Sequence, residues 1–288
     1  MRMKFIFLIF LLSFGCQGCF SNEKNILHPD IHHIDFVITV NKLFTEITLA
    51  NETLDLKVND EFAVLADLTP DGAGNPKYSS SNESVVKVSD EGLITALGNG
   101  TSTVTVSFAG NDNYTAAQNK TISVTVTLND ASVSAEDITL DVGANATVDV
   151  TVVPNGLDVT YVPDNSGVVT IENGVVTAVK EGTAKITLTV GGDGVYALNS
   201  TIITVTVNKI DTSIDVDQSS LNLEVGDDSS ISATLTPADA GNVTFISSDN
   251  KVVTVDDKGN VKAVGEGKAN IIVSFAGDDK YNAAENKT

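Results

Sequence analysis

Residues 108–114 of this chain read FAGNDNY, and residues 275–281 read FAGDDKY, 167 positions further on. Prolines and tyrosines mark two equivalent places in each of three successive copies: Pro70, Pro154 and Pro237, and Tyr114, Tyr196 and Tyr281. The spacing predicts three tandem copies with a period of about 83 residues, which suits a small independent domain better than a solenoid repeat.

Each copy has the pattern of a series of short strands. In the first copy, apolar and polar residues alternate with period two, as in strands that bury one face. The apolar members are Leu54, Leu56 and Val58; Phe62, Val64, Ala66 and Leu68; Val86 and Val88; Val104, Val106 and Phe108; and Ile122, Val124 and Val126. The second set predicts one continuous strand over 61–69. Gly, Asn and Asp separate the sets, as turns require. Six or seven short strands in each copy predict an all-β fold of about three tandem immunoglobulin-like β-sandwich domains.

The start of the chain predicts export. Arg2 and Lys4 precede an apolar run over 5–14 that is too short to span a bilayer as a helix. We expect residues 1–21 to be a signal peptide, and we expect no membrane-spanning segment after it. The mature protein is therefore expected to be extracellular, at the cell surface.

Two cysteines, Cys16 and Cys19, lie in this processing region, and the chain contains no others. The repeats therefore fold without disulfides. A lipid anchor on Cys16 is an alternative to ordinary cleavage. It is the less favoured one, because Gly15 is the only residue before Cys16 that fits a lipidation motif.

Composition narrows the possible partners. The formal net charge is −21, and Arg2 is the only arginine. Nucleic acid is a poor partner for such a chain, because phosphate recognition depends on basic patches and on arginine. Calcium would suit acidic turns such as 256–260 and Asp278-Asp279. Acidic residues followed by Gly are also ordinary turn chemistry, and we favour that interpretation.

Two recurrent positions have a structural explanation. Gly100, Gly182 and Gly267 each lie between two strands, where a tight turn needs a positive φ. The three equivalent tyrosines each follow a Gly/Asp turn, and we expect the ring to close one end of the sandwich while its hydroxyl caps a loop. Carbohydrate binding by these rings is the less favoured alternative, because sugar sites present several aromatic residues.

A motif in each copy resembles the bacterial immunoglobulin-like (BIG) domains, especially their second group. Residues 92–106 read GLITALGNGTSTVTV, residues 174–186 read GVVTAVKEGTAKI, and residues 259–271 read GNVKAVGEGKANI. The FAGxDxY element is similar to repeats of adhesin-like cell-surface proteins. The resemblance extends over residues 43–288. It implies a fold and a surface setting, and it brings no catalytic residues.

Enzyme chemistry has little support in the sequence. The three histidines, His28, His32 and His33, all precede the repeats, and no repeat contains cysteine. No His-based triad or thiolate nucleophile can therefore form within a repeat. The histidines with nearby aspartates could hold a metal, but a solvated tail is favoured. We expect no enzyme activity, and no catalytic, cofactor-binding or metal-binding residues.

The predicted order is a signal peptide over 1–21, a linker with a short leading strand over 22–42, and repeats over 43–128, 129–208 and 209–288. The third repeat lacks its final strand, because NKT at 119–121 runs into the strand around Val124 whereas NKT at 286–288 is followed by no further residue.

The leading segment also has a counterpart within the chain. Residues 37–42 resemble 205–209, the close of the second repeat. We favour the interpretation that the leading strand is the entry to the first sandwich of a longer repeat protein. The alternative is strand exchange, in which residues 36–40 of one molecule complete the third repeat of a neighbouring copy.

These features together predict an exported, non-enzymatic stalk or adhesin-like protein whose ligand is a surface protein or a glycan. The alternative function is a passive spacer for an enzymatic or carbohydrate-binding module outside this chain.

Overall fold

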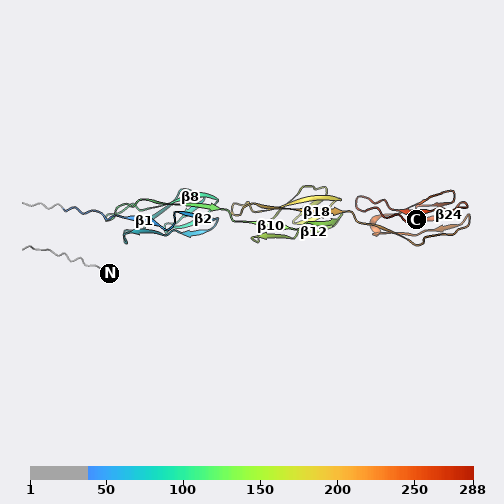
Figure 1. Ribbon diagram of the computed structural model, residues 1–288, viewed down its shortest axis with the longest axis horizontal. Coiled ribbons are helices and arrows are strands. Elements are labelled where there is room, and N and C mark those ends of the chain that lie inside the picture. The colour runs from blue at the N-terminus through green and yellow to red at the C-terminus, as the bar shows by residue number, and fades with distance from the viewer. Residues whose placement is uncertain (1–37) are drawn as a thin grey trace, which may run out of the picture. The chain divides into compact units, whose positions relative to one another are not determined.

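The computed structural model describes residues 38–288. The predicted signal peptide, both cysteines and the three histidines lie outside the described residues. Residues Leu43–Thr288 form one compact unit that is built from strands, apart from the short 3-10 helix η1 (Ala238–Ala240). The predicted all-β, immunoglobulin-like fold class is confirmed (Figure 1).

The first repeat contains a four-stranded sheet and a three-stranded sheet. Its strands are β1 (Glu46–Leu49), β2 (Thr53–Lys57), β3 (Glu61–Ala63), β4 (Ala66–Thr69), β5 (Lys77–Ser80), β6 (Val86–Val88), β7 (Leu93–Ala96), β8 (Gly100–Ser107) and β9 (Lys120–Thr127). The larger sheet has the order β2-β9-β8-β5, the smaller has the order β3-β7-β6, and β1 pairs with β4. β2 runs parallel to β9, whereas β8 runs antiparallel to it.

The second repeat has the same topology. Its strands are β10 (Ser132–Ala135), β11 (Ile138–Asp141), β12 (Asn145–Thr147), β13 (Val150–Val153), β14 (Thr160–Pro163), β15 (Val169–Glu172), β16 (Val175–Ala178), β17 (Gly182–Val190) and β18 (Asn199–Asn208). The sheets are β11-β18-β17-β14, β12-β16-β15 and the pair β10-β13. Here β11 takes the place of β2, and β18 takes the place of β9.

The third repeat keeps only part of this plan. Its strands are β19 (Ser213–Val216), β20 (Asp228–Ser230), β21 (Ala233–Thr236), β22 (Thr244–Ser247), β23 (Val253–Val255), β24 (Asn260–Ala263) and β25 (Ile271–Ser274). The pair β19-β21 and the sheet β20-β24-β23 have counterparts in the other repeats, but the four-stranded sheet is reduced to β22-β25. Figure 1 shows β24 in this last repeat, drawn in orange to red.

The alternating residues of the strands form a separate buried cluster in each repeat. In the first repeat, Val104, Val106 and Val124 are completely buried, and their polar neighbours along the strands face outward. The clusters of the first and second repeats contain 16 and 13 buried residues, whereas that of the third contains six. The third repeat therefore has much the smallest core.

The prediction of one continuous strand over 61–69 is wrong. It is divided into β3 and β4, which pair with β7 and β1 respectively. Val64, between them, donates its amide hydrogen to Gly92 O at 2.9 Å, and Leu65 is exposed. The alternation of apolar residues is continuous because a strand that crosses from one sheet to the other keeps facing the same core.

The predicted positive φ at the three equivalent glycines is confirmed. The φ angles are 144° at Gly100, 146° at Gly182 and 151° at Gly267. A Cβ atom at Gly267 would lie 2.8 Å from Val252 Cγ2, so both backbone conformation and space favour glycine here.

Candidate functional site

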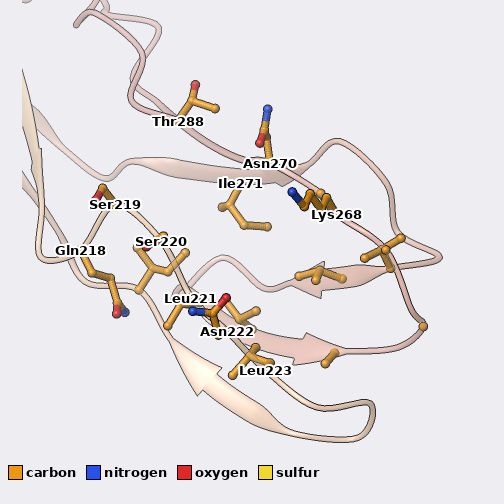
Figure 2. Close-up of a pocket in the computed structure, with 18 of the residues that line it drawn as sticks. Gln218, Ser219, Ser220, Leu221, Asn222, Leu223, Lys268, Asn270, Ile271 and Thr288 are labelled. Atoms are coloured by element: carbon orange, nitrogen blue, oxygen red, sulfur yellow. The ribbon is translucent and has the colours of Figure 1, made fainter.

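A cavity lies along the open edge of the third repeat. It measures about 730 Å³ and is lined on one side by 218–225 and on the other by 267–271, with Lys287 and Thr288 at one end. Val253 and Val261 also line it. We call this cavity the edge groove. Figure 2 shows Ile271 projecting toward the segment 220–223, while Asn270 points away from it.

In the first repeat, a strand fills the corresponding position. There β9 lies between β2 and β8, and it pairs with both. Val58, just after β2, donates its amide hydrogen to Thr127 O at 3.0 Å, and its side chain is only 3% exposed. Val225, the equivalent residue of the third repeat, is 66% exposed. Among the described residues, the edge groove therefore lies where β9 lies in the first repeat.

The pairing at which β9 begins in the first repeat is also present in the third. Lys287 and Val273 form an isolated antiparallel bridge, with hydrogen bonds of 2.8 Å from Val273 N to Lys287 O and 3.0 Å in the reverse direction. The same pairing in the first repeat joins Val106 to Lys120, the first residue of β9. The ladder in the third repeat thus begins in the normal register.

The equivalent tyrosines lie at the other end of each repeat. Each forms an isolated parallel bridge with the residue that enters its repeat: Leu43 with Tyr114, Asn129 with Tyr196, and Ile210 with Tyr281. Tyr281 is 3% exposed, and its hydroxyl donates a 2.6 Å hydrogen bond to Asp239 Oδ2. The predicted role in closing the sandwich and capping a loop is confirmed for Tyr281.

Electrostatics around Tyr281 reflect these hydrogen bonds. The Tyr281 hydroxyl, and then the Lys280 ammonium, hold the pKa of Asp239 below its ordinary value. Hydrogen bonds to Tyr281 and Asp239 raise the pKa of Lys280. The backbone amides of Tyr281 and Lys280 lower the pKa of Asp278, whose Oδ1 atom accepts both. All three groups are therefore charged near neutral pH, where they order the loop.

The acidic turn at 256–260 is built in the same way. Asp256 Oδ1 accepts hydrogen bonds from Lys258 N at 2.9 Å and Asn260 N at 2.8 Å. The Asn260 side chain, at 2.7 Å, is the largest cause of the lowered pKa of Asp256. The carboxylate thus closes the turn, as the favoured interpretation requires.

Two general features bear on function. Among residues 38–288, no three His, Cys, Asp or Glu side chains gather closely enough to hold a metal ion. No helix of this part of the chain is long and apolar enough to cross a membrane. The predicted lipidation site Cys16 and the histidine cluster lie outside it.

The junction between the first and second repeats is held by specific contacts. Asn129 Nδ2 donates hydrogen bonds to Val58 O at 3.0 Å and to Val195 O at 3.4 Å, so it joins the two repeats. Lys57 Nζ lies 3.3 Å from Asp130 Oδ2, and Val195 packs against the core of the first repeat. The closing strand β9 therefore leads directly into the next repeat.

Tandem β-sandwich repeats joined in this way define an all-β protein of consecutive immunoglobulin-like domains. The model of the bacterial Ig-like domain (group 2) matches residues 43–117 and 210–281, which together are half of the chain. The chain belongs to this family, and the predicted resemblance is confirmed.

One relative is an uncharacterized protein of Clostridium acetobutylicum, 37% identical over 113 residues. The match covers 38% of this chain and 11% of the relative, so the chain spans about a tenth of the length of that curated protein.

Similar solved structures include domains 4 and 5 of the S-layer protein SbsC, with 21% identity over 57% of this chain and 96% of that one and a TM-score of 0.28. The I9–I11 tandem of titin is 12% identical over 83% and 97%, with a TM-score of 0.32. Drosophila N-cadherin EC1–4 is 14% identical over 82% and 71%, with a TM-score of 0.26.

Proposed function

We propose that the chain is exported and forms the stalk or the adhesive part of a cell-surface protein, without catalysis. The observation that carries the proposal is the direct junction between repeats. A closing strand enters the next repeat without a Gly/Ser/Pro linker, and Asn129 holds both sides. A direct junction of this kind keeps the second repeat in place on the first, which suits display at a distance from the cell.

Family membership and charge support the same function. The bacterial Ig-like domains match at both ends of the repeat array, and a net charge of −21 keeps an exposed protein soluble and self-repelling. The proposed ligand is a surface protein or a glycan. A nucleic-acid partner is not proposed, because the repeats contain no arginine.

The location is tested on intact cells that make the protein, by antibody labelling and by brief protease treatment. We expect labelling without permeabilisation and loss of the protein to external protease, while a cytoplasmic control protein is spared. Labelling only after permeabilisation would contradict the proposal.

The adhesive role is tested with beads coated with residues 22–288, applied to immobilised surface proteins and glycans at physiological salt. Beads coated with an unrelated β-sandwich of similar net charge are the control. Binding above this control supports an adhesive part. Cell-surface location without binding supports the alternative function, a spacer for another module.

A further inference from the structure

We propose that the repeats are N-glycosylated, with an oligosaccharide joined to the side-chain amide nitrogen of asparagines in Asn-x-Ser/Thr sequences. The inference rests on the proposed export, because this modification belongs to exported proteins. It adds covalent modification sites that neither a stalk nor an adhesive function requires.

The acceptor sequence occurs throughout the three repeats. Nine asparagines stand two residues before a serine or threonine, with a residue other than proline between: Asn51, Asn82, Asn99, Asn113, Asn119, Asn145, Asn199, Asn242 and Asn286. All nine lie within the described residues, and all nine are exposed. Asn145 and Asn199 are the first residues of β12 and β18, and the others lie in loops. The sequences therefore lie where a modifying enzyme can reach them.

The amide nitrogens of these nine asparagines are available for modification. Within residues 38–288, none of the nine donates a hydrogen bond from Nδ2 to another protein atom, and Asn82 uses only its Oδ1, as an acceptor. Asparagines outside the acceptor sequences do donate from Nδ2, namely Asn111, Asn129, Asn260 and Asn282. A sugar on Nδ2 would disrupt bonds of the second kind, whereas on the nine it disrupts none.

One loop of the first repeat contains an asparagine of each kind. Asn111 donates from Nδ2 to Ala73 O at 2.8 Å. Its Oδ1 accepts hydrogen bonds from the backbone amides of Asn113 and Tyr114, at 3.0 and 3.1 Å. Asn113 begins an acceptor sequence with Thr115, and its side chain is exposed. The asparagine that orders this loop therefore lacks the acceptor sequence, and the neighbouring one that has it leaves its amide nitrogen available.

The hydroxyl group of the sequence separates the sites further. The acceptor sequence needs its hydroxyl as well as its amide, so a site that is open in the folded protein exposes both. In the first and second repeats, four sites have an exposed threonine whose hydroxyl bonds to no other described residue: Asn51 with Thr53, Asn99 with Thr101, Asn119 with Thr121, and Asn145 with Thr147. At Asn113, in contrast, Thr115 is half-buried and its hydroxyl accepts the Thr45 amide at 3.2 Å. The four open sites are the primary sites of modification.

The reaction is the transfer of a sugar from oxygen to nitrogen. A bond forms between asparagine Nδ2 and C1 of the first sugar, and the bond from C1 to a phosphate oxygen of a lipid-linked oligosaccharide breaks. The lipid phosphate leaves with the electron pair, and Nδ2 loses one of its two protons. No atom is oxidised or reduced. The donor is the lipid-linked oligosaccharide, and the transferase is a separate enzyme of the exporting cell.

The first test is peptide mass spectrometry of the full chain recovered from the surface of the cells that make it. We expect oligosaccharide on Asn51, Asn99, Asn119 and Asn145, while Asn111 stays unmodified. The same chain made in a cytoplasm that lacks the transferase supplies the unmodified masses. Surface protein without sugar at any of the four sites would overturn this proposal and leave the proposed location intact. Unmodified protein found only inside the cells would overturn both.

The second test uses matched threonine variants of the full chain in the same cells. Thr101→Ala should abolish the sugar on Asn99, and Thr101→Ser should retain it, because serine keeps the hydroxyl. Thr103→Ala removes an exposed threonine of the same strand, β8, outside any acceptor sequence, so it should leave the sugar in place. Continued modification of Asn51 in each variant shows that export is unaffected. Sugar that persists on Asn99 in Thr101→Ala, or is lost equally in Thr103→Ala, would contradict the proposal.

Discussion

The first and third repeats contain nearly the same segment in two different states. Residues 54–58 read LDLKV and form most of β2, whereas residues 221–225 read LNLEV and form no strand. Both have the alternation of a half-buried strand. Only the first has a neighbour, β9, with which it pairs in parallel. The comparison shows that this strand is stabilised by its pairing partner, and that its own sequence is insufficient.

The largest expected effect is on the stability of the isolated third repeat. Appending ISVTVTL to residues 209–288 should raise its free energy of unfolding by about 4 kcal/mol or more, because three apolar side chains at roughly 1.5–3 kcal/mol each leave water. Calorimetry and chemical denaturation measure this change.

The matched control carries the extension DSDTDTL, with aspartate at the three inward positions. It should give no stabilisation. If residues 209–288 without extension already unfold as cooperatively, and at as high a temperature, as the extended repeat, the edge groove does not lower the stability of the third repeat.

Two leucine-to-alanine substitutions test the comparison between the first and third repeats. Leu54→Ala should destabilise the first repeat by about 2–4 kcal/mol, because a buried leucine is lost beside β9. Leu221→Ala, at the equivalent place beside the groove, should cost less than about 1 kcal/mol. Chemical denaturation of both variants in the full array measures the difference. Equal losses would mean that Leu221 is as well packed as Leu54.

A glycine substitution should act equally in both repeats. Gly100→Ala and Gly267→Ala each place a Cβ at positive φ beside a valine methyl group, so each should cost about 1–3 kcal/mol. Gly143→Ala, where φ is also positive but nothing lies within 4 Å, separates backbone strain from crowding. A cost confined to one repeat would show that this turn is not equivalent in the two.

The smallest expected difference between the two repeats is in their stability at low pH. Asp278 accepts two backbone amides, and these lower its pKa, whereas Asn111 has the equivalent place in the first repeat and does not titrate. A lowered carboxyl pKa stabilises the fold fully above the unfolded value near 3.8, and this contribution is lost as the pH falls through the lower folded value.

Asp278→Asn should therefore reduce the acid sensitivity of the third repeat below about pH 4 while leaving the first repeat unchanged. Thermal unfolding between pH 2 and pH 6 measures the effect. An unchanged pH profile would mean that the Asp278 hydrogen bonds contribute nothing to stability.

The sequence alone was sufficient to predict the repeats, the fold class and the longer strands. The longer strands could be predicted because β8 and β9 each carry three buried residues at period two. Short strands gave weaker patterns. β5 reads KYSS, with one apolar residue, and β1 has two, so neither was predicted. The break between β3 and β4 was missed because both halves face one core.

The described residues of the third repeat include no counterpart of β9. The effect of this difference on 221–225 could not be predicted from the sequence, because alternation reports which side chains are apolar and cannot report whether a partner strand is present. The edge groove thus follows from long-range pairing. The predicted domain boundaries, the lipidation of Cys16 and the ligand remain predictions.

Hydrogen exchange of residues 22–288 tests the comparison most directly. Those amides of 53–58 and 101–104 that bond to β9 should be strongly protected, whereas their counterparts in 220–225 and 268–271 should exchange orders of magnitude faster, because the described residues hold no central strand to bond them. Equal protection of the two sets would contradict the claim that the third repeat holds an open strand position.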